Sequence, residues 1–284
     1  MKKPALKETA FWQETALFEE REILSDLLEK KGPSLFLGKY SLNEAIAVLK
    51  KRNFLSDAQK RNLWPLKYDL DSSEYPLQRF QIFYEDKKPE NLIVDLKIRE
   101  GKFKPKDDFF LTDASSEFKF LIFEWLTLQN PRLSFSQDKT PLPGQRYPGL
   151  GLGKKVLDVF VYLARLLGCD GILAFPAYFH NALLFSRYFH FLNPEKQAEI
   201  VAVTESTRDV TFKQLSWIVY LECLRDKNNK IFEWKAEELI FPLNKKLRSY
   251  FDSKEYKKIL KDARKKLLFS VDWDCYQKKV NSEK

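Results

Sequence analysis

One stretch of the chain, residues 148–193, constrains the fold more than any other. Three glycines alternate with leucines over 149–153, and a helical pattern follows directly. The apolar positions of that pattern recur at helical spacing on one face: Val156, Phe160, Leu163 and Leu167. The helix predicted over 154–167 ends at Gly168, and a short apolar strand is predicted over 172–175. Because a strand is also predicted before the turn, this order indicates a βαβ-like crossover between parallel strands.

The glycine turn has the chemistry of an anion cradle. Glycine permits the positive φ angles that let several backbone N–H groups point at one anion. The start of the following helix adds unpaired N–H groups and the positive end of its dipole. Lys154 and Lys155 in the first turn add positive charge, so a phosphate group is the expected ligand. The alternative is a tight turn that only allows the helix to pack on a sheet.

Two common nucleotide-binding loops do not fit the spacing. A P-loop requires Ser or Thr directly after its lysine, whereas Lys154 is followed by Lys155. A dinucleotide-binding turn requires G-x-G-x-x-G, whereas the glycines here stand at 149, 151 and 153. A phosphate in this turn therefore belongs to another class of cofactor.

The strand patterns elsewhere predict a mixed α/β fold. The alternating runs 79–84 and 92–98 are joined by a short polar loop and predict an antiparallel hairpin. Residues 118–128 are long and rich in aromatic residues, which is typical of a buried strand. Shorter strands are predicted over 132–135 and 231–234.

Helical patterns flank these strands. The helices predicted outside the crossover cover residues 8–31, 41–51, 210–223 and 253–268. Ser41 and Glu44 form the spacing of a capping box at the start of the second of these helices. The chain therefore divides into an N-terminal helical region (1–72), an α/β core (73–205) and a mainly helical, basic region (206–284).

The crossover resembles the cofactor-binding segment of the GNAT acyltransferases. That family has a turn of the form R/Q-x-x-G-x-G/A, followed by an amphipathic helix and a strand. Arg146, Gly149 and Gly151 satisfy this motif in one register. In a second register, residues 151–154 (Gly-Leu-Gly-Lys) fill the end of the motif and Pro148 stands in place of the arginine. The second register places the helix better.

Residues after the predicted strand extend the resemblance. In the family an Asn lies close to the cofactor and a Tyr follows at the interval that separates Asn181 from Tyr188. The resemblance implies that Tyr188 protonates the departing CoA thiolate, or that Phe185 takes the Tyr position instead. It also implies a GNAT-like, largely antiparallel mixed sheet flanked by helices, with additional helices at both ends.

The resemblance implies an acyl-CoA-dependent N-acyltransferase. It would transfer the acetyl group of acetyl-CoA, or another acyl group, to an amine of a small molecule or a protein, with the pyrophosphate of CoA in the glycine turn. The residues implied in cofactor binding are Gly149, Leu150, Gly151, Leu152, Gly153, Lys154 and Asn181. The alternative is a GNAT-like protein that has lost catalysis and acts as a binding or scaffold protein.

Acyl transfer to an amine needs a general base, and two residues are candidates. Glu124 lies between Phe123 and Trp125 in a predicted strand, where burial would raise the pKa of its carboxyl group. Strand alternation also allows Glu124 to face the solvent. His180, directly before Asn181, could act through a water molecule, and the alternative is a structural histidine.

Several other classes of protein are disfavoured. The sequence has no G-x-S-x-G motif of a serine hydrolase. Its three cysteines, Cys169, Cys223 and Cys275, have no C-x-x-C spacing, and with two histidines they predict no metal site and a reducing compartment. Neither a secretory signal nor a run long enough to span a bilayer is recognised, so we expect a cytoplasmic protein without a membrane partner.

The net charge of +9 is concentrated near the end of the chain. Residues 245–284 hold 13 Lys and Arg against 6 Asp and Glu, a net charge of +7. Such a segment can attract nucleic acid, which is the partner expected if the protein is a scaffold. The simpler explanation is the solvated face of a helix.

Overall fold

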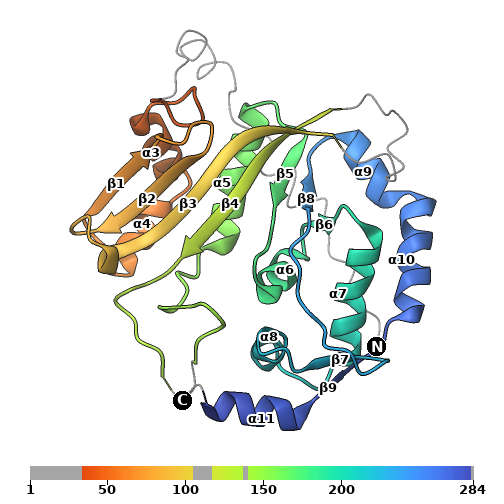
Figure 1. The fold of residues 1–284 in the computed structure, drawn as a ribbon. Helices are drawn as coiled ribbons and strands as arrows, with labels where there is room; N and C mark the ends of the chain where they lie inside the picture. Colours follow the sequence, from red (N-terminus) through yellow and green to blue (C-terminus); the bar gives the residue numbers. More distant parts are fainter. Residues whose placement is uncertain (1–33, 105–116, 137–139, 283–284) are drawn as a thin grey trace.

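A seven-stranded mixed sheet forms the centre of the protein (Figure 1). The computed structural model describes residues 34–104, 117–136 and 140–282. The strand order across the sheet is β1-β2-β3-β4-β5-β8-β6. The bounds of the strands are Leu66–Asp71 (β1), Gln78–Tyr84 (β2), Leu92–Phe103 (β3), Phe118–Leu128 (β4), Gly171–Ala174 (β5), His190–Phe191 (β6) and Leu239–Pro242 (β8).

One parallel pair interrupts an otherwise antiparallel sheet. Phe120 to Phe123 of β4 pair in parallel with Gly171 to Ala174 of β5, and the other strand pairs are antiparallel. Helix α5 (Gly153–Leu166) connects the two parallel strands. The predicted mixed α/β class, the hairpin, the strand over 118–128 and the βαβ-like crossover are therefore confirmed.

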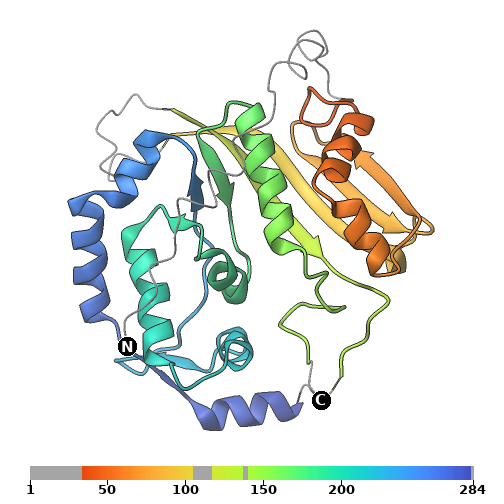
Figure 2. The same cartoon turned by 180° about the vertical axis from the view of Figure 1, so that it is seen from behind.

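Helices cover both faces of the sheet. Seen from behind, α3 (Leu42–Lys51), α4 (Phe54–Lys60) and α5 lie over one face (Figure 2). Helix α9 (Lys245–Asp252) packs on the opposite face, where Leu247, Tyr250 and Phe251 meet the other row of β4 side chains. The remaining helices of the described residues are α6 (Phe179–Phe185), α7 (Pro194–Ser206), α8 (Phe212–Tyr220), α10 (Lys254–Lys266) and α11 (Trp273–Ser282), with a short 3-10 helix at Pro89–Asn91.

Local sequence signals account for several of these elements. The Ser41 hydroxyl accepts the Glu44 N–H and the Glu44 carboxylate accepts the Ser41 N–H, so the predicted capping box starts α3. On α5 the predicted apolar face is buried, and the Phe160 ring lies 4.1 Å from that of Phe123 on β4. Helices α8 and α10 lie within the ranges predicted from periodicity.

Three predicted elements differ from the structure. Residues 132–135 form no strand, because the chain turns directly after β4 and Asn130. Residues 231–234 form no strand either, and Ile231 makes a single bridge to Arg225. The neighbouring two-stranded sheet is instead built from β7 (Leu224–Asp226) and β9 (Phe269–Val271). The helix predicted over 8–31 lies outside the described residues.

The sheet takes strands from all three predicted regions. Strand β1 lies in the region 1–72 and pairs with β2, so this region is not purely helical. Strand β8, from the region 206–284, inserts between β5 and β6. The Tyr250 and Tyr256 hydroxyls donate to the backbone oxygens of residues 192 and 191. Because buried tyrosines anchor α9 and α10, the start of the basic segment 245–284 is part of the folded core rather than an appended tail.

Candidate functional site

The glycine turn is fixed at the carboxyl end of β4. The Leu150 N–H donates to the Leu128 oxygen over 3.1 Å, and the Asn130 N–H donates to the Pro148 oxygen over 2.7 Å. Gly151 has a φ of +73°, which a residue with a side chain rarely adopts. These contacts hold the turn and the start of α5 in one defined place.

The start of α5 has no side-chain cap. The N-cap residue is Leu152, whose side chain can accept no hydrogen bond. The first turn contains no acidic residue and two lysines, Lys154 and Lys155. Positive side chains at the positive end of a helix dipole destabilise the helix. An anion at this position would offset that cost.

Space is open in front of this terminus. A Cβ atom added to Gly153 would meet no heavy atom of the described residues within 4 Å. At Gly151 the nearest such atom is Arg61 Nη2 at 3.8 Å, which belongs to a long and flexible side chain. Close contacts therefore do not require glycine at 151 or 153, whereas the positive φ of Gly151 also fits the alternative of a tight turn that lets the helix pack on the sheet.

Arg61 is a candidate residue that sequence reasoning missed. It caps the end of α4, and its Nη1 donates to the Asp57 backbone oxygen over 2.9 Å. The Asp57 carboxylate forms an ion pair with Lys155, and the hydrogen bond from Lys155 is the main cause that lowers the pKa of Asp57. The Asp57 carboxylate thereby offsets much of the positive charge of Lys155, and Arg61 supplies a guanidinium group beside the turn.

The structure favours the second register of the turn motif. Helix α5 begins at Gly153, so residues 151–154 coincide with the helix start. Arg146, the arginine of the first register, is exposed and stacks on its neighbour, with Cζ 5.3 Å from the centroid of the Tyr147 ring. In this register Pro148 stands at the arginine position, and the guanidinium group of Arg61 lies beside Gly151.

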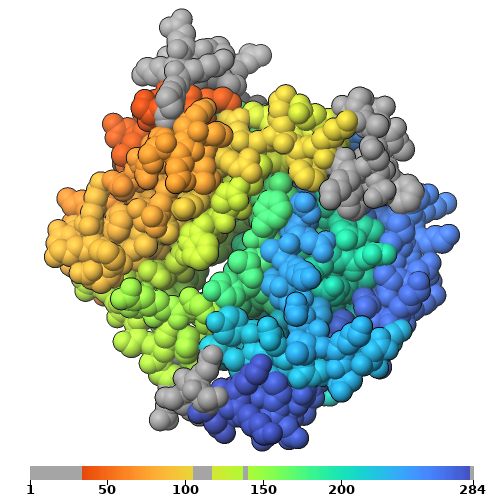
Figure 3. All heavy atoms as spheres, viewed as in Figure 1, coloured from red at the N-terminus to blue at the C-terminus, as the bar shows by residue number. Residues whose placement is uncertain are grey.

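The two parallel strands, β4 and β5, separate from each other next to the glycine turn. Pairing between β4 and β5 ends at Phe123 and Ala174, while β4 continues to Leu128. In the described structure no strand pairs with residues 124–127 on the β5 side. The surface is hollowed between yellow-green β4 and the green and teal segments that include β5 and α6 (Figure 3).

Exposed aromatic residues follow the point where the strands separate. Trp125 on β4 is 45% exposed, and Phe175, directly after β5, is 37% exposed. Openings that lie at the carboxyl ends of parallel strands and are lined by aromatic side chains are common ligand sites in α/β proteins. The opening and the uncapped start of α5 together form the candidate cofactor site.

Glu124 does not have the surroundings that a desolvated base requires. Ile98 pairs with Phe123 and Lys97 pairs with Trp125, so Glu124 is the extra residue of a β-bulge. Its carboxylate is solvent-exposed and accepts a 2.8 Å hydrogen bond from Arg99 Nε. The solvent-facing alternative is confirmed, and the expected burial is wrong because the bulge interrupts the alternation of the strand.

His180 is a buried side chain in the first turn of α6. It is 5% exposed, and its ring stacks on Tyr178 with the centroids 5.2 Å apart. Burial lowers the pKa of His180 to about 4, because the charged form is desolvated. The imidazole is therefore neutral near pH 7 and a weak base, which matches the structural alternative.

Asn181 and Tyr188 lie on different elements. Asn181 is in the first turn of α6, and its N–H donates to the Tyr178 oxygen over 3.0 Å. Tyr188 lies beyond the end of α6 and is 37% exposed. Phe185 is the last residue of α6, and its ring lies 5.4 Å from that of Phe189. Of the two positions considered for the acid, only Tyr188 has a hydroxyl group.

The proline-rich loop before the turn is held by aromatic side chains. The Trp217 indole N–H donates to the Pro141 oxygen over 2.9 Å. A Cβ atom on Gly144 would come within 2.4 Å of the Tyr178 hydroxyl oxygen, so this glycine is needed for close approach. The loop is therefore fastened both to α8 and to the segment that follows β5.

The described residues contain no group of three or more His, Cys, Asp or Glu side chains that could hold a metal ion. Across the same residues, no helix combines the length and apolar character needed to cross a lipid bilayer. No protein-family model, curated protein or solved structure matches the chain. The site must therefore be interpreted from its own geometry.

Proposed function

We propose that the protein is an acyl-CoA-dependent N-acyltransferase that holds the pyrophosphate of acyl-CoA at the glycine turn. One observation carries the proposal: the uncapped start of α5 and the opening between β4 and β5 both lie at the carboxyl ends of these two strands. A ligand with an anionic group and an extended arm would use both features. Acyl-CoA has this shape, and the resemblance of residues 146–188 to GNAT acyltransferases supports the same cofactor.

The anionic part of the ligand is matched by the charge at the turn. The pyrophosphate would accept hydrogen bonds from the first N–H groups of α5. Lys154, Lys155 and the Arg61 guanidinium place positive charge beside the turn, and the charge of Lys155 is partly offset by its ion pair with Asp57. Charge-assisted hydrogen bonds of this kind are about twice as strong as neutral ones.

The extended arm of acyl-CoA fits the part of β4 that has no strand partner on the β5 side. Between its pyrophosphate and its thioester, acyl-CoA carries two amide groups in an extended chain. The backbone of residues 124–127 has no strand partner on the β5 side within the described structure. Amide groups can pair with such an edge in the way that an added strand does. This pairing would bring the thioester to the deeper part of the opening.

The chemical step joins an amine nitrogen to the thioester carbon and breaks the carbon–sulfur bond. The departing thiolate takes up a proton, and we assign its donation to Tyr188, whose side chain is partly exposed after α6. The amine nitrogen loses one proton to water, and Tyr188 regains its proton from water, so the step balances. Glu124 is paired with Arg99 and His180 is buried, so the proposal gives neither of them the role of general base. The acceptor is an amine, either of a small molecule or of a protein side chain.

Calorimetric titration with CoA and acetyl-CoA tests the cofactor site. We expect binding by the wild type, and a Kd raised at least 30-fold in Gly153→Glu, because a carboxylate would then occupy the cradle. Gly153→Lys is the matched control: it adds a side chain of similar length at the same open position, but its charge favours the anion. Absence of any binding at millimolar CoA would refute the proposal.

Release of free CoA thiol from acetyl-CoA, measured over a panel of amines, tests catalysis separately. We expect turnover with at least one amine, and a rate lowered about 100-fold in Tyr188→Phe with unchanged CoA affinity. Tight CoA binding without thiol release would instead identify a binding protein.

The second candidate function is nucleic-acid binding by a GNAT-like scaffold. It is favoured by an exposed basic face on α10, which includes Lys254, Lys257, Lys258 and Lys261. Deleting residues 245–284 is not a usable test, because Tyr250 and Tyr256 are buried in the core. The double reversal Lys254→Glu/Lys261→Glu should abolish salt-dependent RNA or DNA binding if this candidate is correct.

A further inference from the structure

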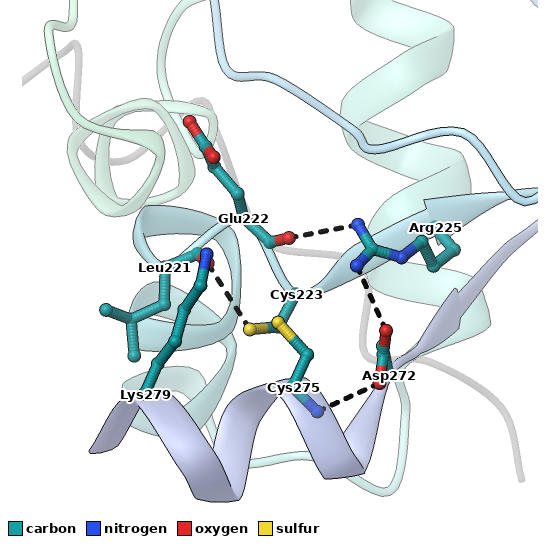
Figure 4. Close-up of polar contacts among 7 residues, drawn as sticks. All are labelled: Leu221, Glu222, Cys223, Arg225, Asp272, Cys275 and Lys279. Carbon is teal, nitrogen blue, oxygen red and sulfur yellow. Dashed lines mark hydrogen bonds and ion pairs between the residues drawn. The ribbon is translucent and has the colours of Figure 1, made fainter. Parts of the chain in front are cut away.

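Two cysteines that are distant in the sequence meet in the structure. Cys223 lies directly before β7 and is fully buried, whereas Cys275 lies in the first turn of α11 and is half-buried. Figure 4 shows the two side chains with their sulfur atoms next to each other, and Cys275 is among the causes that raise the pKa of the Cys223 thiol. The Cys223 thiol donates to the Leu221 oxygen over 3.3 Å. Both cysteines are free in this structure.

A network of polar contacts holds the two cysteines in place. The Asp272 N–H donates to the Cys223 oxygen over 2.9 Å, and the Cys275 N–H donates to Asp272 Oδ1 over 3.0 Å. Arg225 Nη2 donates to Asp272 Oδ2 over 3.0 Å, and Lys279 Nζ donates to the Leu221 oxygen over 2.6 Å. Three of these contacts join α11, or the residue before it, to the segment 221–225, and the fourth ties the start of α11 to Asp272. The approach of the sulfurs is therefore imposed by the surrounding backbone.

We infer that Cys223 and Cys275 form a reversible disulfide under oxidising conditions and that this bond locks α11 onto the end of α8. The inference does not depend on the proposed acyltransferase activity. It rests on the sulfur contact and on the polar network around it.

The difference in exposure sets the order of the chemical steps. Burial is the main cause that raises the pKa of the Cys223 thiol to about 12, so this side chain stays protonated and does not react first. A peroxide reaches Cys275, its O–O bond breaks, and the Cys275 sulfur becomes a sulfenic acid while water leaves. The Cys223 sulfur then attacks the Cys275 sulfur, and the S–S bond forms as its thiol proton and the sulfenic hydroxyl leave as water. Two thiols are oxidised and one peroxide is reduced.

The disulfide would act on the loop beside the candidate cofactor site. Leu221, which accepts the Lys279 hydrogen bond, is the C-cap of α8. Trp217 of the same helix holds the proline-rich loop through the Pro141 oxygen. Oxidation would therefore restrict the movement of α8 and of the loop that leads into the glycine turn.

Thiol counting and peptide mapping on the intact native protein test this inference. After treatment with hydrogen peroxide, we expect free thiols to fall from three to one. Non-reducing mass spectrometry should detect a peptide pair containing Cys223 and Cys275, lighter by two hydrogens. The apparent Tm should rise by about 5 °C and return to its initial value after reduction, because the bond closes a long loop.

Two variants that each lack one thiol serve as matched comparisons. Cys169→Ala should still form the peptide pair, whereas Cys275→Ser should not. Three free thiols after peroxide treatment of the native wild type would overturn the inference. So would a linked pair that contains Cys169, or oxidation of Cys275 to a sulfinic acid without a disulfide.

Discussion

The starts of α3 and α5 solve the same physical problem in opposite ways. Every α-helix begins with N–H groups that have no partner within the helix. At α3 the Ser41 hydroxyl and the Glu44 carboxylate satisfy such groups reciprocally. At α5 the equivalent position is Leu152, and glycine and lysines follow it. The first terminus is capped by its own side chains, whereas the second has no side-chain cap, and we propose that an anion binds there.

The start of α5 differs from those of most other described helices, although the seven-residue helices α4 and α6 also lack a side-chain cap. Side-chain oxygens accept backbone N–H groups at the starts of α7, α8, α9 and α10, from Asn193, Thr211, Asn244 and Ser253. An N-cap of this type stabilises a helix by about 1 kcal/mol. Side-chain caps are thus common, but not universal, at the helix starts of the described residues. What sets α5 apart is the combination of a missing cap, two lysines in the first turn and open space at Gly153, and this combination supports the proposed anion site.

The start of α6 contains a buried histidine, His180, whose burial should make the stability of the fold depend on pH. The pKa of His180 is about 4 in the folded protein, below its ordinary value of 6.5. Below pH 6.5 the unfolded chain takes up a proton that the folded chain does not, so stability is full above pH 6.5 and falls towards pH 4. Between pH 6.5 and pH 4.5 this one group should lower the free energy of unfolding by about 2 kcal/mol.

Urea unfolding of the wild type and of His180→Gln at these two pH values measures the contribution. Carboxyl groups also titrate in this range, but they are common to both proteins and cancel in the comparison. The variant should lose about 2 kcal/mol less than the wild type on acidification. Equal losses would show that His180 is not held neutral by burial.

The sequence was sufficient to predict local structure but not long-range contacts. The glycine turn, α5 and the capping box at Ser41 are encoded by residues close together in the chain, and all are present. Strand β8 was missed because Leu239 to Pro242 is too short for a period to be recognised, and its pairing with β5 spans many residues. Short segments acquire their structure from partners rather than from their own pattern.

The same distinction applies to the candidate site. Glu124 was placed in the correct strand, but strand alternation could not reveal the β-bulge that exposes it beside Arg99. Arg61 lies far from the turn in sequence and follows an ordinary helix, so no local signal marks it. Its role depends on the packing of α4 near the start of α5, which only the structure shows.

Arg61 provides the sharpest test of the charge at the open terminus. If the guanidinium group binds the pyrophosphate, Arg61→Ala should raise the Kd for CoA by about 10- to 30-fold, because a charge-assisted hydrogen bond is lost. Arg61→Lys should recover part of the affinity, since it keeps the charge but not the forked geometry. Both values can be measured by calorimetric titration.

Arg146→Ala is the matched control for Arg61. Arg146 belongs to the other register of the turn motif and stacks on Tyr147. Its loss should change the Kd for CoA less than threefold, because an exposed charge contributes little. A larger effect at Arg146 than at Arg61 would reverse the assignment of the register.

The smallest predicted effect falls on the terminus that is already complete. Ser41→Ala removes the acceptor for the Glu44 N–H and should lower the free energy of unfolding by about 1 kcal/mol. The Kd for CoA should not change, because α3 contributes its cap to the fold alone. Ser249→Ala, at an exposed position within α9, should leave stability unchanged within about 0.5 kcal/mol. If Ser41→Ala weakened CoA binding as strongly as Arg61→Ala does, the contrast between the capped and the open helix start would not explain where the ligand binds.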